Sequence, residues 1–102
     1  GLRLAREAEI ALFRIVQEAL ANAARHAKAT EIVVSMDGSP EVFRLEVADN
    51  GAGFDLAAPQ AEGGRGAMGI PIMQRRAESV RGSFRIESRP GLGTSVIVEV
   101  PR

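Results

Sequence analysis

The sequence predicts an α+β domain in which two helices cover one face of a mostly antiparallel sheet. Two segments carry apolar residues at helical spacing, and two pairs of shorter segments carry them in alternation. Along the chain they follow the order α-β-β-loop-α-β-β, which is typical of helices gathered on one face of an antiparallel sheet. We therefore expect a two-layer sandwich with an antiparallel or mixed sheet and a long loop before the second helix.

The first helix is predicted over residues 8–27. Apolar residues recur at offsets of 4, 7, 8, 11 and 15 positions from Leu12, which places them on one face of a helix. Glu7 and Glu9 lie near its start and His26 and Lys28 near its end, as the helix dipole favours.

Two strands and a long loop are predicted next. The strands cover residues 31–36 and 41–48, and the turn sequence Asp-Gly-Ser-Pro over residues 37–40 joins them. Ile32, Val34 and Met36 share one face of the first strand. Residues 54–69 are rich in Gly and Ala and show no period. An irregular segment of this length is unusual in a compact domain, so we expect a mobile functional loop.

The C-terminal half is predicted to hold a helix and a hairpin. The helix covers residues 70–80 and tolerates Pro71 in its first turn. The hairpin pairs residues 83–88 with 94–100 around a Pro-Gly-Leu-Gly turn, and Val96, Val98 and Val100 alternate toward the core.

Composition excludes several classes of function. The chain has 102 residues, the size of one domain, and 13 basic residues balance 13 acidic ones. With no net charge and only 4% aromatic residues, nucleic-acid binding is not expected. The absence of Cys and the single His exclude thiolate and two-histidine metal sites and leave a carboxylate-based Mg²⁺ site.

We also expect a cytoplasmic location for the domain, with no direct membrane contact. No segment has the roughly 20 apolar residues that span a bilayer, and no signal peptide opens the chain. The start at Gly1 leads us to expect a fragment of a longer protein. Membrane anchoring of that longer protein through another segment is compatible with this expectation.

A polar row on the first helix is the first candidate site. At about 100° per residue, Glu18, Asn22 and His26 fall within one arc of about 80°, beside the apolar stripe. A carboxylate, an amide oxygen and an imidazole in such a row suit the floor of a cleft. The same row also fits the polar margin of an amphipathic helix with His26 as a C-terminal cap.

The sequence Asp49-Asn-Gly51-Ala-Gly53 is the second candidate. A carboxylate at the end of an inner strand needs a hydrogen-bond donor, and the amine of adenine is one. The two glycines lack Cβ and allow a flat ring to lie against the backbone. Asp-Asn-Gly is equally a common tight-turn sequence.

Two further segments are rich in glycine. Residues 63–69 precede the predicted second helix, where free N–H groups bind phosphate oxygens, although a flexible linker has the same composition. They match neither a P-loop nor a dinucleotide fingerprint. Residues 90–94 form a hairpin turn that ends in Thr94.

Together these segments resemble the ATP-binding domain shared by sensor histidine kinases, gyrase, Hsp90 and MutL proteins. The resemblance runs from about Leu12 to Pro101 and keeps four boxes in the family's order. Phe-Arg-Ile-Val-Gln-Glu-Ala-Leu-Ala-Asn-Ala-Ala-Arg-His-Ala over residues 13–27 is similar to the N box of the kinase subgroup that pairs with NarL-type response regulators. Asp-Asn-Gly-Ala-Gly-Phe over 49–54 resembles the G1 box, the Gly-rich stretch and Met-Gln-Arg-Arg-Ala-Glu over 73–78 the G2 region, and Gly-Leu-Gly-Thr over 91–94 the last box.

The resemblance implies a role for each candidate residue. It implies that Asn22 binds Mg²⁺ with Glu18 beside it, that His26 contacts phosphate, and that Asp49 accepts a hydrogen bond from the adenine amine. Gly51 and Gly53 would border the base, Thr94 would lie close by through water, and residues 54–69 would form the ATP lid with Gly66 and Gly69 near the phosphates. One position departs from the family: Ala67 replaces the first glycine of the G2 box.

The implied function is donation of the γ-phosphoryl group of Mg-ATP to a histidine on a separate dimerisation domain, and from there to a NarL-type response regulator. The fragment lacks the dimerisation helices, so we expect it to bind nucleotide without autophosphorylating. Two alternatives share the fold: a serine kinase of the anti-sigma-factor type, and a nucleotide-sensing module without transfer activity.

Overall fold

The computed structural model describes residues 4–24, 29–51, 65–89 and 91–102, with side chains in the second helix described from Ile70 onward. Its elements follow the predicted order: α1 (Arg6–Asn22), β1 (Ile32–Gly38), β2 (Val42–Asp49), α2 (Arg65–Ser79), β3 (Ser83–Ser88) and β4 (Thr94–Pro101). Among these residues, no helix is long and apolar enough to cross a membrane.

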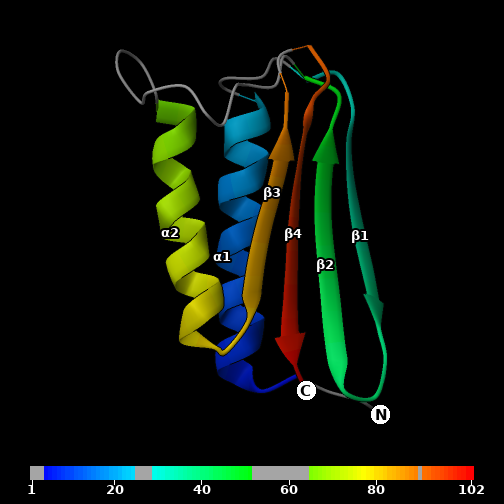
Figure 1. Cartoon of the computed structure of the whole chain (residues 1–102), viewed down its shortest axis with the longest axis vertical. Helices are drawn as coiled ribbons and strands as arrows, with labels where there is room; N and C mark the ends of the chain where they lie inside the picture. Colours follow the sequence, from blue (N-terminus) through cyan, green and yellow to red (C-terminus); the bar gives the residue numbers. More distant parts are fainter. Residues whose placement is uncertain (1–3, 25–28, 52–64, 90) are drawn as a thin grey trace.

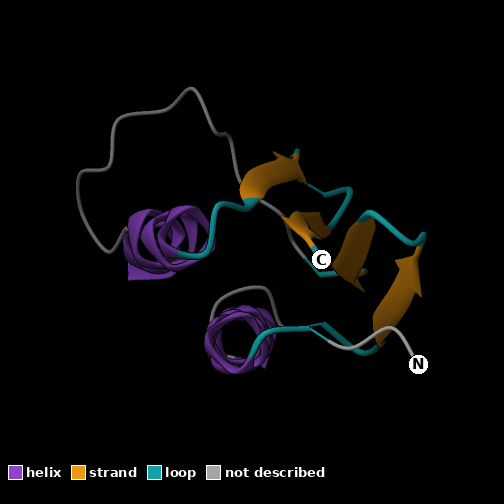
Figure 2. Cartoon of the chain, turned by 90° about the horizontal axis from the view of Figure 1, so that it is seen from below, coloured by secondary structure: helices purple, strands orange, loops and turns teal. Residues whose placement is uncertain are grey.

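The strands form one four-stranded sheet in the order β1-β2-β4-β3. Every neighbouring pair is antiparallel, so the sheet is not mixed. Both helices lie on the same face of the sheet, α1 and α2 side by side, and no helix of the described residues covers the other face (Figures 1 and 2). The predicted two-layer α+β fold is therefore confirmed for the described residues. The predicted lid lies outside them, apart from its last residues.

The core lies between the helices and the inner strands. Leu45 of β2 stands opposite Val98 of β4, and both are buried. Ile15 from α1 and Met73 from α2 pack against this face and are also fully enclosed. Alternation along β2 and β4 thus gives the sheet one apolar face, and the helices cover it.

The apolar face of β1 is less covered than the apolar face of β2. Val34 is 41% exposed and Met36 68% exposed, although both lie on the same face as the core residues of β2. β1 is an edge strand, and neither helix packs extensively against it. Alternation therefore indicated the strand correctly but not the degree of burial.

The first helix differs from the prediction at both ends. It begins at Arg6, two residues early, and its regular α-helical part ends at Asn22. Ala23 and Ala24 continue as a wider, π-helical turn, and the amide of Ala29 donates to the carbonyl of Ala23 at 3.3 Å. The remaining residues of the predicted helix, 25–27, lie outside the described residues.

The second helix begins at Arg65 rather than at residue 70. Gly66 and Gly69 are therefore part of its first turns and do not lie in the loop ahead of it. Pro71 lies inside the helix, where it leaves one carbonyl without an intrahelical donor. Glycine has low helix propensity, so the local pattern pointed to loop, and the tertiary fold overrides it.

The end of α2 is a Schellman motif. The amide of Gly82 donates to the carbonyl of Ala77 at 2.7 Å, and the amide of Arg81 donates to the carbonyl of Glu78 at 3.0 Å. Arg81 has a φ of 62°, at the position where this motif usually has glycine. The motif turns the chain directly into β3.

Candidate functional site

The predicted site segments come together at one end of the molecule. The C-terminal end of α1, the ends of β2 and β3 and the beginnings of β4 and α2 all lie there (Figure 1). These element ends carry Asn22, Asp49, Thr94 and Gly66. Residues that are far apart in the sequence thus share one edge of the fold.

Asp49 and Thr94 stand directly opposite each other on neighbouring strands. Side chains of such a pair lie about 4.5–5.5 Å apart at Cβ, on the same face. Both residues are half-buried, at the end of the apolar face that carries Val47 and Val96. The two residues predicted to meet adenine are therefore adjacent, although they come from strands that do not follow each other in the sequence.

The Asp49 carboxylate is held in one orientation. Its Oδ1 accepts a hydrogen bond from the amide of Gly51 at 2.8 Å, and Gly51 itself is buried. Oδ2 accepts no hydrogen bond from the part of the chain that the structure describes. A fixed carboxylate with one free oxygen is suited to accept a hydrogen bond from a ligand.

Gly93 allows the turn before β4 to approach the backbone of Asp49 closely. Its φ is +81°, which L side chains rarely adopt. A Cβ at this position would overlap the carbonyl oxygen of Asp49 and lie 3.3 Å from the Cα of Asn50. The last box and the G1 box are therefore in backbone contact, and only glycine fits between them.

Ser88 is a site residue that the sequence did not single out. Its Oγ lies 2.7 Å from Oγ1 of Thr94, and it donates to the carbonyl of Gly93 at 3.1 Å. Ser88 pairs with Thr94 across β3 and β4. The register of the predicted hairpin was the signal that could have found it, because it places the last residue of one strand opposite the first of the other.

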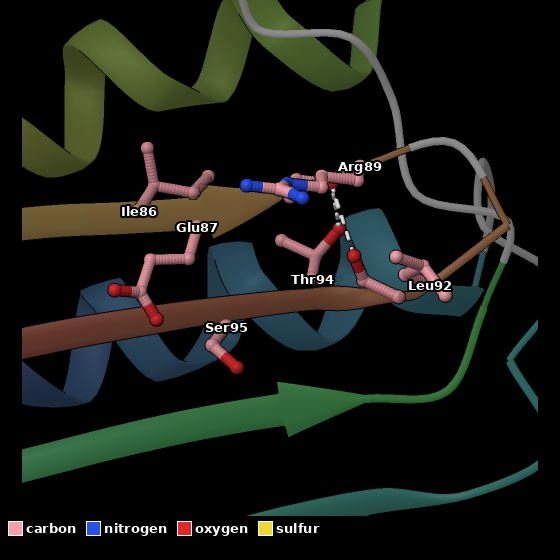
Figure 3. A pocket seen from close by; sticks show the side chains of 8 residues that line it. Ile86, Glu87, Arg89, Leu92, Thr94 and Ser95 are labelled. Atoms are coloured by element: carbon pink, nitrogen blue, oxygen red, sulfur yellow. Dashed lines mark hydrogen bonds between the residues drawn. The ribbon is translucent and has the colours of Figure 1, made fainter.

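A polar hollow of about 520 Å³ opens at this end of the β3–β4 hairpin. In Figure 3, Arg89 and Leu92 lie near the turn, with Thr94 between the two strands. Neither Asp49 nor Asn22 lines this hollow. It is lined by Ile86, Glu87, Ser88, Arg89, Leu92, Gly93, Thr94 and Ser95.

Glu18 and Asn22 lie one turn apart on the same face of α1, and both are half-buried. Neither side chain forms a hydrogen bond with another described residue. Oxygen donors that are partly desolvated and otherwise free fit a hard cation such as Mg²⁺, which needs only one or two protein ligands beside phosphate. No group of three or more metal-binding side chains occurs among the described residues.

The remaining predicted residues divide into two groups. His26 and Gly53 lie outside the described residues, so their positions stay predictions. Gly66 lies in the first turn of α2, where backbone N–H groups have no intrahelical acceptor. Gly69 is the fifth residue of the helix, and its N–H faces the carbonyl of Arg65. Of the two, only Gly66 has an amide without an intrahelical acceptor, as phosphate binding at a helix start requires.

Comparison with known proteins identifies the family. Residues 7–102 match the model of the family "Histidine kinase-, DNA gyrase B-, and HSP90-like ATPase", and the chain belongs to this family. Its class is therefore that of an ATP-binding domain, as the four boxes predicted.

The curated relatives are sensor kinases. The chain is 39% identical over 101 residues to the signal transduction histidine-protein kinase/phosphatase DegS of Brevibacillus brevis, covering 99% of the chain and 25% of DegS. It is 40% identical over 90 residues to the sensor histidine kinase LiaS of Bacillus subtilis, covering 88% of the chain and 24% of LiaS. The chain thus spans about a quarter of these relatives.

Solved structures agree on the fold. The histidine kinase domain from the Erythrobacter litoralis EL346 blue-light activated histidine kinase matches with a TM-score of 0.72 at 24% identity, over 93% of this chain and 45% of that one. ShkA in complex with AMPPNP also matches with a TM-score of 0.72, at 19% identity, over 89% of this chain and 21% of ShkA. The chain is therefore an ATP-binding domain of this family, and the curated relatives that share it are sensor histidine kinases, in agreement with the sequence prediction.

Proposed function

We propose that this domain binds Mg-ATP at the end of its sheet and presents the γ-phosphoryl group to a histidine on a separate dimerisation domain. The observation that carries the proposal is the pairing of Asp49 with Thr94, with one carboxylate oxygen held by Gly51 and the other without a hydrogen bond from any residue that the structure describes. In the curated relatives the matching segment is about a quarter of the protein, so we infer that the 102-residue chain acts as one domain of a longer kinase.

The adenine end of the site follows from this carboxylate. Oδ2 of Asp49 accepts a hydrogen bond from the exocyclic amine, and the Thr94 hydroxyl, held by Ser88, reaches the ring through water. Gly51 and Gly53 leave room for the base to lie against the backbone. Guanine has a carbonyl in place of the amine, so the same carboxylate excludes it.

The magnesium end lies on α1. Asn22 supplies its side-chain oxygen to Mg²⁺ and Glu18 holds the metal or one of its waters. When bound, the ion neutralises charge on the phosphates. His26 and the Gly66 amide would contact the phosphates, with Gly69 beside them as part of the same helix turn.

Phosphoryl transfer requires mainly positioning and charge neutralisation from such a site. The acceptor histidine belongs to the dimerisation domain, and the phosphoryl group passes on to a NarL-type response regulator. We place this activity in the cytoplasm, without nucleic-acid or direct membrane contact by the domain. The AMPPNP bound by ShkA supports a nucleotide as the ligand.

A calorimetric titration with a non-hydrolysable ATP analogue, with and without Mg²⁺, tests the proposal. We expect tighter binding with Mg²⁺ for the wild type and loss of this gain in Asn22→Ala. Gln17→Ala, an exposed amide on the same helix, is the matched control and should bind normally. If Asn22→Ala keeps the full gain, the metal assignment is wrong.

Transfer is tested separately, by supplying the dimerisation domain of a related kinase together with radiolabelled Mg-ATP. We expect label on histidine, which is acid-labile. Binding without transfer would instead identify a nucleotide-sensing module, and acid-stable label on serine a serine kinase.

A further inference from the structure

We propose that Asn50 is a positioning residue, which holds the helix end carrying Asn22 in register with the strand end carrying Asp49. The inference rests on the proposed function, because it concerns the two ends of the same nucleotide site. It adds a residue whose only predicted role was that of a turn former.

The Asn50 side chain forms a three-bond clamp on the segment that leads into β1. Its Oδ1 accepts hydrogen bonds from the amides of Thr30 and Glu31, both at 3.0 Å. Its Nδ2 donates to Oγ1 of Thr30 at 2.9 Å. The Asn50 amide also donates to the carbonyl of Glu31 at 3.2 Å. Most of the hydrogen-bonding groups of this side chain are therefore used in contacts with Thr30 and Glu31.

The clamp is not part of the tight turn itself. Oδ1 of Asp49 caps the amide of Gly51, so the turn is stabilised without the Asn50 side chain. The ladder between β1 and β2 ends with the pair Ile32 and Asp49 and does not reach Thr30. Asn50 thus extends the pairing of the two strands beyond the sheet.

The clamped segment is in turn bonded to the end of α1. The amide of Ala29 donates to the carbonyl of Ala23, the residue after Asn22. Two short tethers in series therefore connect Asn22 with Asp49: Ala23 to Ala29, and Thr30 to Asn50. Each tether lies within one residue of a predicted ligand contact, so loosening the second allows the two ends of the site to move relative to each other.

The clamp is solvent-exposed, which separates positioning from stability. Its hydrogen bonds all lie at the surface, and Asn50 is not a core residue. Surface hydrogen bonds contribute little to the free energy of unfolding. A loss of function on removing Asn50 would therefore come from geometry and not from unfolding.

The experiment compares the Mg²⁺-dependent gain in affinity for a non-hydrolysable ATP analogue among four proteins: the wild type, Asn50→Ala, Asn50→Asp and Thr30→Val. We expect Asn50→Ala to reduce the gain by up to about tenfold, the lower end of the loss caused by removing a residue bonded directly to a metal ligand, because Asn50 acts on Asn22 only through the two tethers. Asn50→Asp keeps the acceptor for both amides and should retain most of the gain. Thr30→Val loses only the hydrogen bond from Asn50 Nδ2, so its Mg²⁺-dependent gain should lie between those of the wild type and Asn50→Ala.

Melting temperatures with and without ligand complete the test. A merely structural role would lower the melting temperature of Asn50→Ala and leave the Mg²⁺ gain unchanged, and that result would overturn the inference. Failure of Asn50→Asp to restore the gain would overturn it as well. If the wild type itself shows no Mg²⁺ gain, the proposed function fails and not the clamp alone.

Discussion

Replacing Gly93 by alanine tests the contact between the last box and the G1 box. The residue has a φ of +81°, and a Cβ there would overlap the carbonyl oxygen of Asp49. Gly91 offers a matched control, since it has nearly the same φ of +80° and nothing within 4 Å of an added Cβ. Comparing Gly91→Ala with Gly93→Ala therefore separates the cost of the positive φ, which both variants share, from the cost of steric overlap, which only Gly93→Ala has.

The magnitudes follow from these two terms. An L residue in the left-handed region costs about 1–2 kcal/mol, and alanine recovers about 0.4–1 kcal/mol by restricting the unfolded chain. Gly91→Ala should therefore lower the free energy of unfolding by about 1 kcal/mol. Overpacking against backbone adds about 1–3 kcal/mol. We expect Gly93→Ala to lose about 2–4 kcal/mol in total.

Urea denaturation measures both values, provided that the slope of the transition stays constant. Binding of the ATP analogue gives a second readout, because Gly93→Ala must displace the Asp49 backbone whereas Gly91→Ala need not. We expect weakened binding only in Gly93→Ala. Equal losses of stability in the two variants, or full affinity in Gly93→Ala, would refute the argument that this approach shapes the site.

Further predictions concern the core, the helix end and the choice of base. Met73→Ala should lower the free energy of unfolding by about 2–5 kcal/mol in urea denaturation, because Met73 is 1% exposed, whereas its 45% exposed neighbour Ile72 should tolerate alanine. Arg81→Gly should raise that free energy by about 1 kcal/mol, since it relieves a positive φ; a loss of stability would contradict the strain argument. Asp49→Asn should weaken ATP-analogue binding about tenfold or more and reduce the preference over GTP, because either amide orientation places a donor against the Gly51 amide or the adenine amine. Asp37→Asn, at the exposed end of β1, is the control, and an unchanged base preference in Asp49→Asn would remove the proposed adenine contact.

Much of the candidate site could be identified from the sequence because its residues lie in short motifs. Asp49 ends a strand with clear alternation, and Thr94 begins another, so local pattern alone placed both at strand ends. Asn22 followed from helical spacing in the same way. What these patterns could not show was which strand ends meet.

Helix boundaries were harder to predict where glycine and tertiary packing oppose each other. Residues 65–69 contain two glycines and precede Pro71, so their local preference is against helix. The fold nevertheless extends α2 back to Arg65. On β1 the alternation identified the strand and its apolar face, but it could not show how much of that face other elements cover.

The sequence by itself determined the order of elements, the antiparallel hairpins and the identity of the motif residues, because these depend on neighbours within a few positions. The tertiary structure decided that β2 lies beside β4, which alone brings Asp49 opposite Thr94 and Gly93 against the Asp49 backbone. It also decided that Asn50 clamps Thr30. These contacts join residues distant in the chain, and they form only when the helices pack on one face of the sheet and fix the order of its strands.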